Sequence, residues 1–210
     1  MKDTKPSSKG GRPRSFDRDE AVETAMQLFW RHGYEGVSLN MLTGAIGIAP
    51  PSLYATFGSK AGLFREAVAR YARQSGLMPM CHDGGQSTLD TALSGFFDRA
   101  IDWITGPDGG CGCMISSGLL AAHPDNEELR DELVGLRRDM AADLEDQLRD
   151  WLSPDCAGIA ASFVCMTLQG LSVQARDGAS PEALRAMADL ARAGVHALAR
   201  QEPAASPISV

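Results

Sequence analysis

The side chains best placed to do chemistry are two cysteines, Cys111 and Cys113, separated by one glycine. The segment that follows, 114–122, is apolar and predicts a helix, so both thiols lie at an expected helix N-terminus. Free N–H groups there favour a thiolate, which could sense oxidants or electrophiles, and a Cys-x-Cys pair can also bind a soft metal such as Cu(I). Cysteine is also an ordinary small core residue. Packing is the favoured interpretation, and thiol sensing through Cys113 with Cys111 is the alternative.

The other titratable residues do not form a catalytic set. The four histidines lack the spacing of a metal site such as His-Glu-x-x-His: His32, His82, His123 and His196. No phosphate-binding glycine loop, nucleophile elbow or carboxylate constellation is present. We therefore expect no catalytic residue, no metal and no cofactor. An enzyme and a purely structural helical module remain the weaker hypotheses.

The charge is divided unequally along the chain. The net charge is −7 and the sequence pI is about 5.1. Residues 1–75 carry four lysines and seven arginines against seven acidic residues, a net +4, whereas residues 76–210 carry −11. A basic first third joined to an acidic remainder indicates two tasks, and a polyanion is a candidate partner for the first.

Length and composition favour a folded, cytoplasmic chain. It has 210 residues, of which 44% are hydrophobic, enough for a substantial core. No run approaches the roughly 18–20 uninterrupted apolar residues that a bilayer span needs, and the polar N-terminus does not look like a signal peptide. Five cysteines, an odd number, in a chain without an export signal argue against a disulfide framework. We expect no membrane association.

Apolar residues recur with helical spacing, and no period-2 strand or internal repeat is present. Asp17 followed by Glu20 predicts the start of a first helix, which Gly33 ends. Later segments predict long helices at 89–104, 129–151, 157–174 and 181–200. The fold class is all-α, with about nine helices.

Residues 38–60 predict two short helices joined by a tight turn. Ser38 can cap the first helix, and Gly47 can take the positive φ of the turn. Pro50 and Pro51 suit the first turn of the second helix, where a missing N–H group matters little. This is the pattern of a helix-turn-helix, whose second helix presents its N-terminal turn to the DNA major groove.

Residues 12–75 resemble the DNA-binding domain of the TetR (TetR/AcrR) family of one-component transcriptional repressors. The matching motifs are Ala25-Met26-x-Leu28-Phe29, Gly33-Tyr34-Glu35, Gly47-Ile48-Ala49, Ser52-Leu53-Tyr54-x-x-Phe57, Ser59-Lys60 and Leu63-Phe64. The resemblance implies a homodimer on a pseudo-palindromic double-stranded DNA operator. It also implies a variable C-terminal helical domain that binds a small-molecule effector and then releases the DNA.

The resemblance assigns DNA contacts to individual residues. It implies phosphate contacts for Ser38, Thr43, Tyr54 and Lys60, and it places Pro50, Pro51, Ser52 and Thr56 at the groove. Position 50 often bears a basic residue in relatives and position 55 an aromatic or His, whereas this chain has proline and alanine. Base recognition would then depend on contacts with thymine methyls and on DNA shape. Gly11-Arg12-Pro13-Arg14 resembles an AT-hook core, so Arg12 and Arg14 either enter a minor groove or belong to a solvated tail.

The expected organisation follows from these assignments. Residues 1–15 are a flexible basic arm, 16–58 the helix-turn-helix domain and 59–75 a connecting helix. Residues 76–202 bind the effector and dimerise, through 154–200, and 203–210 form a disordered tail. Large apolar side chains and one amide are the candidates for lining the effector site: Phe97, Trp103, Met114, Phe163, Met166 and Gln169.

Overall fold

The computed structural model describes residues 16–80, 87–106 and 112–201. These ranges contain eight α-helices and one 3₁₀-helix and no strand, so the all-α prediction is confirmed. The helices are α1 (Arg18–Gly36), α2 (Leu39–Ile46), α3 (Pro50–Phe57), α4 (Lys60–Ser75), α5 (Leu89–Ile104), η1 (Pro124–Asn126), α6 (Glu127–Leu148), α7 (Pro154–Arg176) and α8 (Pro181–Arg200). The arm with Arg12 and Arg14, and Cys111, lie outside the described residues.

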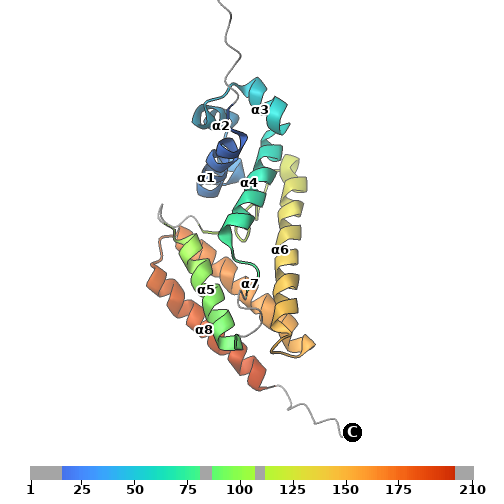
Figure 1. Cartoon of the computed structure of the whole chain (residues 1–210), viewed down its shortest axis with the longest axis vertical. Helices are drawn as coiled ribbons and strands as arrows, with labels where there is room; N and C mark the ends of the chain where they lie inside the picture. Colours follow the sequence, from blue (N-terminus) through green and yellow to red (C-terminus); the bar gives the residue numbers. More distant parts are fainter. Residues whose placement is uncertain (1–15, 81–86, 107–111, 202–210) are drawn as a thin grey trace, which may run out of the picture.

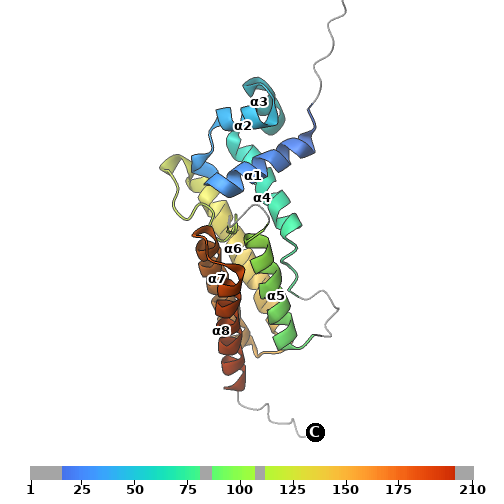
Figure 2. The ribbon, with the colours of Figure 1, turned by 90° about the vertical axis from the view of Figure 1, so that its left-hand side faces the viewer.

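The helices form a small head and a larger body (Figures 1 and 2). Helices α1, α2 and α3 make up the head at one end of the elongated molecule. Helices α5, α7 and α8 lie side by side at the other end, and α6 runs from them towards the head. Helix α4 begins in the head and ends beside the body, so α4 and α6 both connect the two parts.

The turns of the head form where the sequence predicts them. The side chain of Asp17 accepts hydrogen bonds from the N–H groups of Asp19 and Glu20. Helix α1 kinks at Gly33, where φ is 71° and ψ is 168°, and makes one further turn. Gly47 takes the left-handed conformation, with a φ of 76°, between α2 and α3. Local residue chemistry therefore sets the geometry of this part of the chain.

The segment 114–122 corrects one expectation, because it is a series of turns and not a helix. Gly112, just before the segment, and Leu119, within it, deviate from helical geometry, with φ values of 65° and 45°. The guanidinium of Arg137 on α6 donates to the carbonyls of Ile115 (2.9 Å) and Gly118 (3.0 Å). Because a distant side chain satisfies these carbonyls, the segment needs no helical ladder.

Two buried clusters hold the described residues together, and α6 contributes to both. Leu144 and Leu148 belong to the cluster of the body, with α5, α7 and α8. Leu129 and Leu133, at least three turns earlier, belong to the cluster of the head. The head cluster also includes Met114 and Leu119 from the turn segment. The apolar core of the head therefore extends well past the helix-turn-helix.

Helix α7 is long and apolar enough to cross a membrane by length and composition alone. In the fold it packs against α5, α6 and α8. One face, with residues such as Ala157, Val164 and Leu171, is buried in the body cluster. These contacts are those of a core helix.

Candidate nucleic-acid interface and ligand cavity

Helix α3 has one buried face and one exposed face. Leu53 is fully buried and Phe57 nearly so, which fixes the helix on the head. The residues predicted to face DNA lie on the other side: Pro50, Pro51 and Ser52 are exposed, and the Tyr54 side chain is 46% exposed. Thr56 is half-buried. The N-terminal turn of α3 is thus free to approach another molecule.

The two residues predicted to contact phosphate around α2 differ in availability. Ser38 is exposed and caps α2, accepting from the N–H group of Met41 at 3.2 Å. Thr43 is only 8% exposed, and its hydroxyl donates to the carbonyl of Leu39 at 3.0 Å. Since this hydroxyl is used within its own helix, Thr43 does not fit the predicted phosphate contact, and we assign it a packing role.

Lys60 is held in place at the start of α4. Its ammonium nitrogen lies 4.1 Å from the centre of the Tyr34 ring, a cation–π contact. Burial lowers the pKa of Lys60, and the nearby Glu35 carboxylate opposes that shift without cancelling it. The preceding residue, Ser59, caps α4 by accepting from the N–H group of Gly62. Lys60 is therefore a positioned cation one turn from the end of α3.

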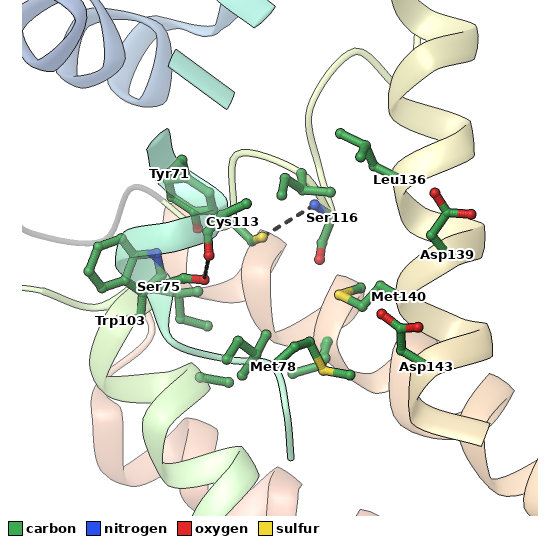
Figure 3. Close-up of a pocket in the computed structure, with 16 residues that line it drawn as sticks. Tyr71, Ser75, Met78, Trp103, Cys113, Ser116, Leu136, Asp139, Met140 and Asp143 are labelled. Atoms are coloured by element: carbon green, nitrogen blue, oxygen red, sulfur yellow. Dashed lines mark hydrogen bonds between the residues drawn. The ribbon is translucent and has the colours of Figure 1, made fainter. Parts of the chain in front are cut away.

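A mostly apolar cavity of about 220 Å³ lies where α4 reaches the body (Figure 3). Its walls come from the C-terminal half of α4 and the residues after it, from α5, α6 and α7, and from the turn segment. The principal lining residues are Tyr71, Ser75, Met78, Trp103, Cys113, Ser116, Leu136, Asp139, Met140 and Asp143.

Of the six residues predicted to line an effector site, Trp103 alone lines this cavity. Phe97 is buried in the body core, with its ring centre 5.9 Å from that of Phe96. Met114 is buried in the head cluster. Phe163 and Met166 are 36% and 62% exposed on α7, and Gln169 is half-buried on the same helix. These six positions were predicted mainly from the size of their side chains. Side-chain size does not indicate whether a residue lies on the face of its helix that lines a cavity.

Three aromatic rings join the cavity to the head. Trp103 stacks on Trp30 of α1 with centres 5.3 Å apart, and Tyr71 meets both rings edge-on at 5.2 and 5.5 Å. The indole N–H of Trp30 donates to the carbonyl of Gly112 at 2.6 Å. A molecule that moves Trp103 or Tyr71 therefore pushes on a helix of the head.

Cys113 lies in the wall of the cavity. Its sulfur accepts from the N–H group of Ser116 at 3.3 Å, and its own N–H group donates to the hydroxyl of Ser172 on α7 at 2.6 Å. The thiol is half-buried. Within the described ranges, no group of three or more His, Cys, Asp or Glu side chains is placed to hold a metal ion.

Comparisons with known proteins agree on one family. Residues 21–67 match the family model of bacterial regulatory proteins of the tetR family. The chain is 34% identical over 188 residues to the HTH-type transcriptional repressor ComR of Escherichia coli K12, covering 85% of this chain and 88% of ComR. It is 33% identical over 191 residues to the repressor BdcR of the same strain, covering 89% and 93%.

A solved structure shares the whole architecture. It is a cysteine mutant of the TetR family transcriptional regulator CifR, complexed with a 26-bp double-stranded operator DNA. The TM-score is 0.76 and the identity 36%, and the match covers 92% of this chain and 100% of the CifR chain. The head and body described above are thus arranged as in a regulator captured on DNA.

Proposed function

The chain belongs to the TetR family of bacterial transcriptional regulators, which are DNA-binding repressors and not enzymes, and from this we propose a specific mode of action. The protein binds a pseudo-palindromic operator as a homodimer and leaves it when a small molecule occupies the cavity of about 220 Å³. The observation that carries this proposal is the packing of Trp103, a wall of the cavity, directly on Trp30 of the head.

The exposed face of α3 is the part of the chain that we assign to DNA. Tyr54 and Lys60 supply a hydroxyl and an ammonium group for phosphates, and Ser38 supplies a second hydroxyl. Pro50, Pro51, Ser52 and Thr56 face the major groove. Because neither proline can donate a hydrogen bond, discrimination between bases depends mainly on apolar contact and DNA shape.

A second copy of the chain would cover the exposed faces of α7 and α8. Large apolar side chains are exposed on these two helices: Ile159, Phe163, Met166, Val173, Met187 and Leu190. Gly194 of α8 lies against the ring of Phe163, where its lack of a side chain permits close packing. A surface of this kind suits an isologous four-helix interface.

Release of the DNA would depend on α4, which connects the cavity to the DNA-binding helix. Helix α4 starts at Lys60, beside α3, and carries Tyr71 into the cavity wall. Two recognition helices must lie about 34 Å apart to reach successive major grooves. A ligand that favours a different tilt of α4 changes this spacing in both protomers. Linkage then requires operator DNA to weaken ligand binding by the same factor.

The DNA surface is tested with an operator selected from random duplexes. Tyr54→Phe combined with Lys60→Ala removes two phosphate partners, so affinity falls for all sequences and the slope of log affinity against log salt shrinks by about 0.9 per lost contact. Thr43→Val is the matched control, because the Thr43 hydroxyl bonds within α2. Full operator affinity in the double variant would refute this docking.

The N-terminal arm is tested by deleting residues 1–14. If Arg12 and Arg14 enter the minor groove, the truncated protein binds the operator more weakly and loses its preference for A·T pairs at the flanks. If the affinity and the preference for A·T pairs are both unchanged, the arm is a solvated tail that does not contact DNA.

Thiol control is a second candidate, supported by the place of Cys113 in the cavity wall. The Ser116 N–H group donates to its sulfur at 3.3 Å. The guanidinium of Arg137 lies close enough to interact with the same group. A protein with Cys111→Ser and Cys113→Ser separates the two mechanisms. If oxidants release the wild type from the operator but not this variant, control depends on the thiols. If a non-covalent ligand releases both proteins from the operator, control depends on the cavity.

A further inference from the structure

Two buried donors in the cavity wall lack partners. Tyr71 is 1% exposed, and neither its hydroxyl nor the buried indole N–H of Trp103 makes a hydrogen bond of standard geometry within the described part of the chain. The two groups lie near each other, and Cys113 and the backbone of Met114 lie near the hydroxyl. Burial raises the pKa of Tyr71, so the phenol keeps its proton and can donate it. Unsatisfied buried donors are rare in proteins, and an acceptor on a bound ligand is one way to satisfy them.

The opposite wall carries two carboxylates. Asp139 and Asp143 lie one turn apart on α6 and, as Figure 3 shows, across the cavity from Tyr71 and Trp103. Neither carboxylate has a hydrogen-bond or ion-pair partner among residues 16–80, 87–106 and 112–201. Other acidic residues of α6 are paired, such as Asp131 with Arg130 and Glu132 with Arg65. The two free carboxylates are thus confined to the cavity side of the helix.

The charged residues that line the cavity determine the charge of the ligand that it can bind. No Lys, Arg or His is found among the described lining residues. The nearby Arg137 donates to the backbone carbonyls of Ile115, which lines the cavity, and Gly118, which does not. Two unpaired negative charges beside an apolar surface repel an anion and attract a cation. Between the carboxylates and the donors, Met78, Leu136 and Met140 provide an apolar surface.

We propose that the effector is a small lipophilic amine, with a hydrogen-bond acceptor at the end opposite its ammonium group. The ammonium group pairs with Asp139 and Asp143, the apolar middle lies between Met140 and Met78, and the acceptor meets Tyr71 and Trp103. The cavity of about 220 Å³ is smaller than a typical site for drug-sized ligands, roughly 300–1,000 Å³, so the ligand is of fragment size. This inference rests on the effector-released repressor proposed above.

Four aryl probes of nearly equal size test the chemistry. 4-Methoxyphenethylamine has both features, 2-(4-methoxyphenyl)ethanol lacks the charge, 4-methoxyphenylacetate reverses it, and 4-ethylphenethylamine lacks the acceptor. Binding to the full-length protein is measured by calorimetry and by tryptophan fluorescence, to which Trp103 of the cavity wall contributes. We expect the methoxy amine to bind about tenfold more tightly than the alcohol, and the acetate to bind more weakly still.

Variants locate each interaction. Asp139→Asn with Asp143→Asn lowers the affinity for the methoxy amine about tenfold, to that of the alcohol, and leaves the alcohol unaffected. Asp131→Asn, on α6 but outside the cavity lining, changes neither affinity. Tyr71→Phe weakens binding of the methoxy amine more than that of the ethyl amine. These differences between probes identify specific contacts, because loss of folding would weaken all probes together.

The possible outcomes separate this inference from the proposed function. If the amine binds as described but does not release the operator, the ligand class stands and effector release fails. If the acetate or the alcohol equals the amine, or the double Asp variant has no effect, the amine assignment is overturned. Failure of all four probes to bind overturns the cavity assignment itself.

Discussion

The DNA-facing surface of the head and the cavity of the body are built in opposite ways. The head surface is convex and comes from two eight-residue helices whose ends are set by neighbouring residues such as Ser38 and Gly47. The cavity is concave and brings together residues as distant in the chain as Tyr71 and Leu168. The local shape of the head surface is set by neighbouring residues, whereas the shape of a cavity between helices depends on how distant helices pack.

The two regions nevertheless share structural elements. Helix α6 has one end in each buried cluster. Trp30 belongs to α1 of the head, yet its ring packs on Trp103 and its N–H group bonds to Gly112. The part that we assign to DNA and the part that holds the cavity are thus separate at the surface but share a continuous interior.

The largest expected effect comes from paired truncations on α6. Leu133→Ala and Leu144→Ala each remove a buried leucine, so each should lower the free energy of unfolding by about 2–5 kcal/mol in denaturant titrations. Only Leu133 belongs to the head cluster, so Leu133→Ala should weaken operator binding under conditions where both variants are folded. Equal operator affinity in the two variants would contradict this division of α6.

Two glycines, one inside α2 and one directly after it, give the next effect. Gly47 has a φ of 76°, so Gly47→Ala should destabilise the protein by about 1–2 kcal/mol. Gly44 lies inside the same helix with open space around it, and Gly44→Ala should stabilise by about 0.5–1 kcal/mol. Opposite shifts in the midpoint of thermal unfolding would confirm that local backbone geometry sets this surface. Shifts of the same sign would reject it.

Trp30→Phe tests the connection between the regions. The substitution keeps an aromatic ring but loses the hydrogen bond to Gly112, so stability falls by about 1 kcal/mol. Trp151→Phe is the control, because the Trp151 indole also donates to a backbone carbonyl, that of Ser87, at 3.1 Å. Both variants should lose similar stability in urea. Only Trp30→Phe should reduce the factor by which a cavity ligand weakens operator binding.

The smallest effect depends on pH. The backbone N–H of His123 and the amide of Asn126 donate to Glu35 at 3.0 and 2.9 Å, and these bonds hold the pKa of Glu35 below its ordinary value of 4.5. A lowered pKa gives stability that is present above the ordinary value and is lost as the pH falls through the lowered one. Because Glu35 is exposed, the loss should be less than about 1 kcal/mol.

The matched variant for this pH effect is Glu35→Gln. Urea midpoints measured from neutral pH down to about pH 3 should fall more steeply for the wild type than for Glu35→Gln. Parallel profiles would mean that this contact between the head and the segment before α6 carries no stability.

The sequence predicted most of the head because its signals are local. Asp17, Ser38 and Ser59 cap the helices that follow them, and the prolines of α3 stand in its first turn, as expected. Helix α8 spans the predicted residues, 181–200. Each of these features depends on residues within a few positions of one another. Such local features can be predicted from the order of residue types in the sequence.

The cavity could not be predicted in the same way. The turns of 114–122 depend on Arg137 and Ser172, which are distant in the chain. One signal was available, since Asp139 and Asp143 fall on the same helical face as Leu136 in a stripe of otherwise apolar residues. An acidic residue on an apolar face indicates that the face does not pack entirely against a neighbour.

The apolar side chains exposed on α7 and α8 also bear on the life of the protein in the cell. A newly made single chain presents Ile159, Met166 and Leu190 to water, and in the homodimer that we propose a second copy covers them. Its thermal midpoint should then rise with protein concentration, as for any assembly whose subunits stabilise one another. Chains made in small numbers would be degraded or aggregate before pairing. The proposed interface would thus set a minimum expression level below which the protein does not accumulate.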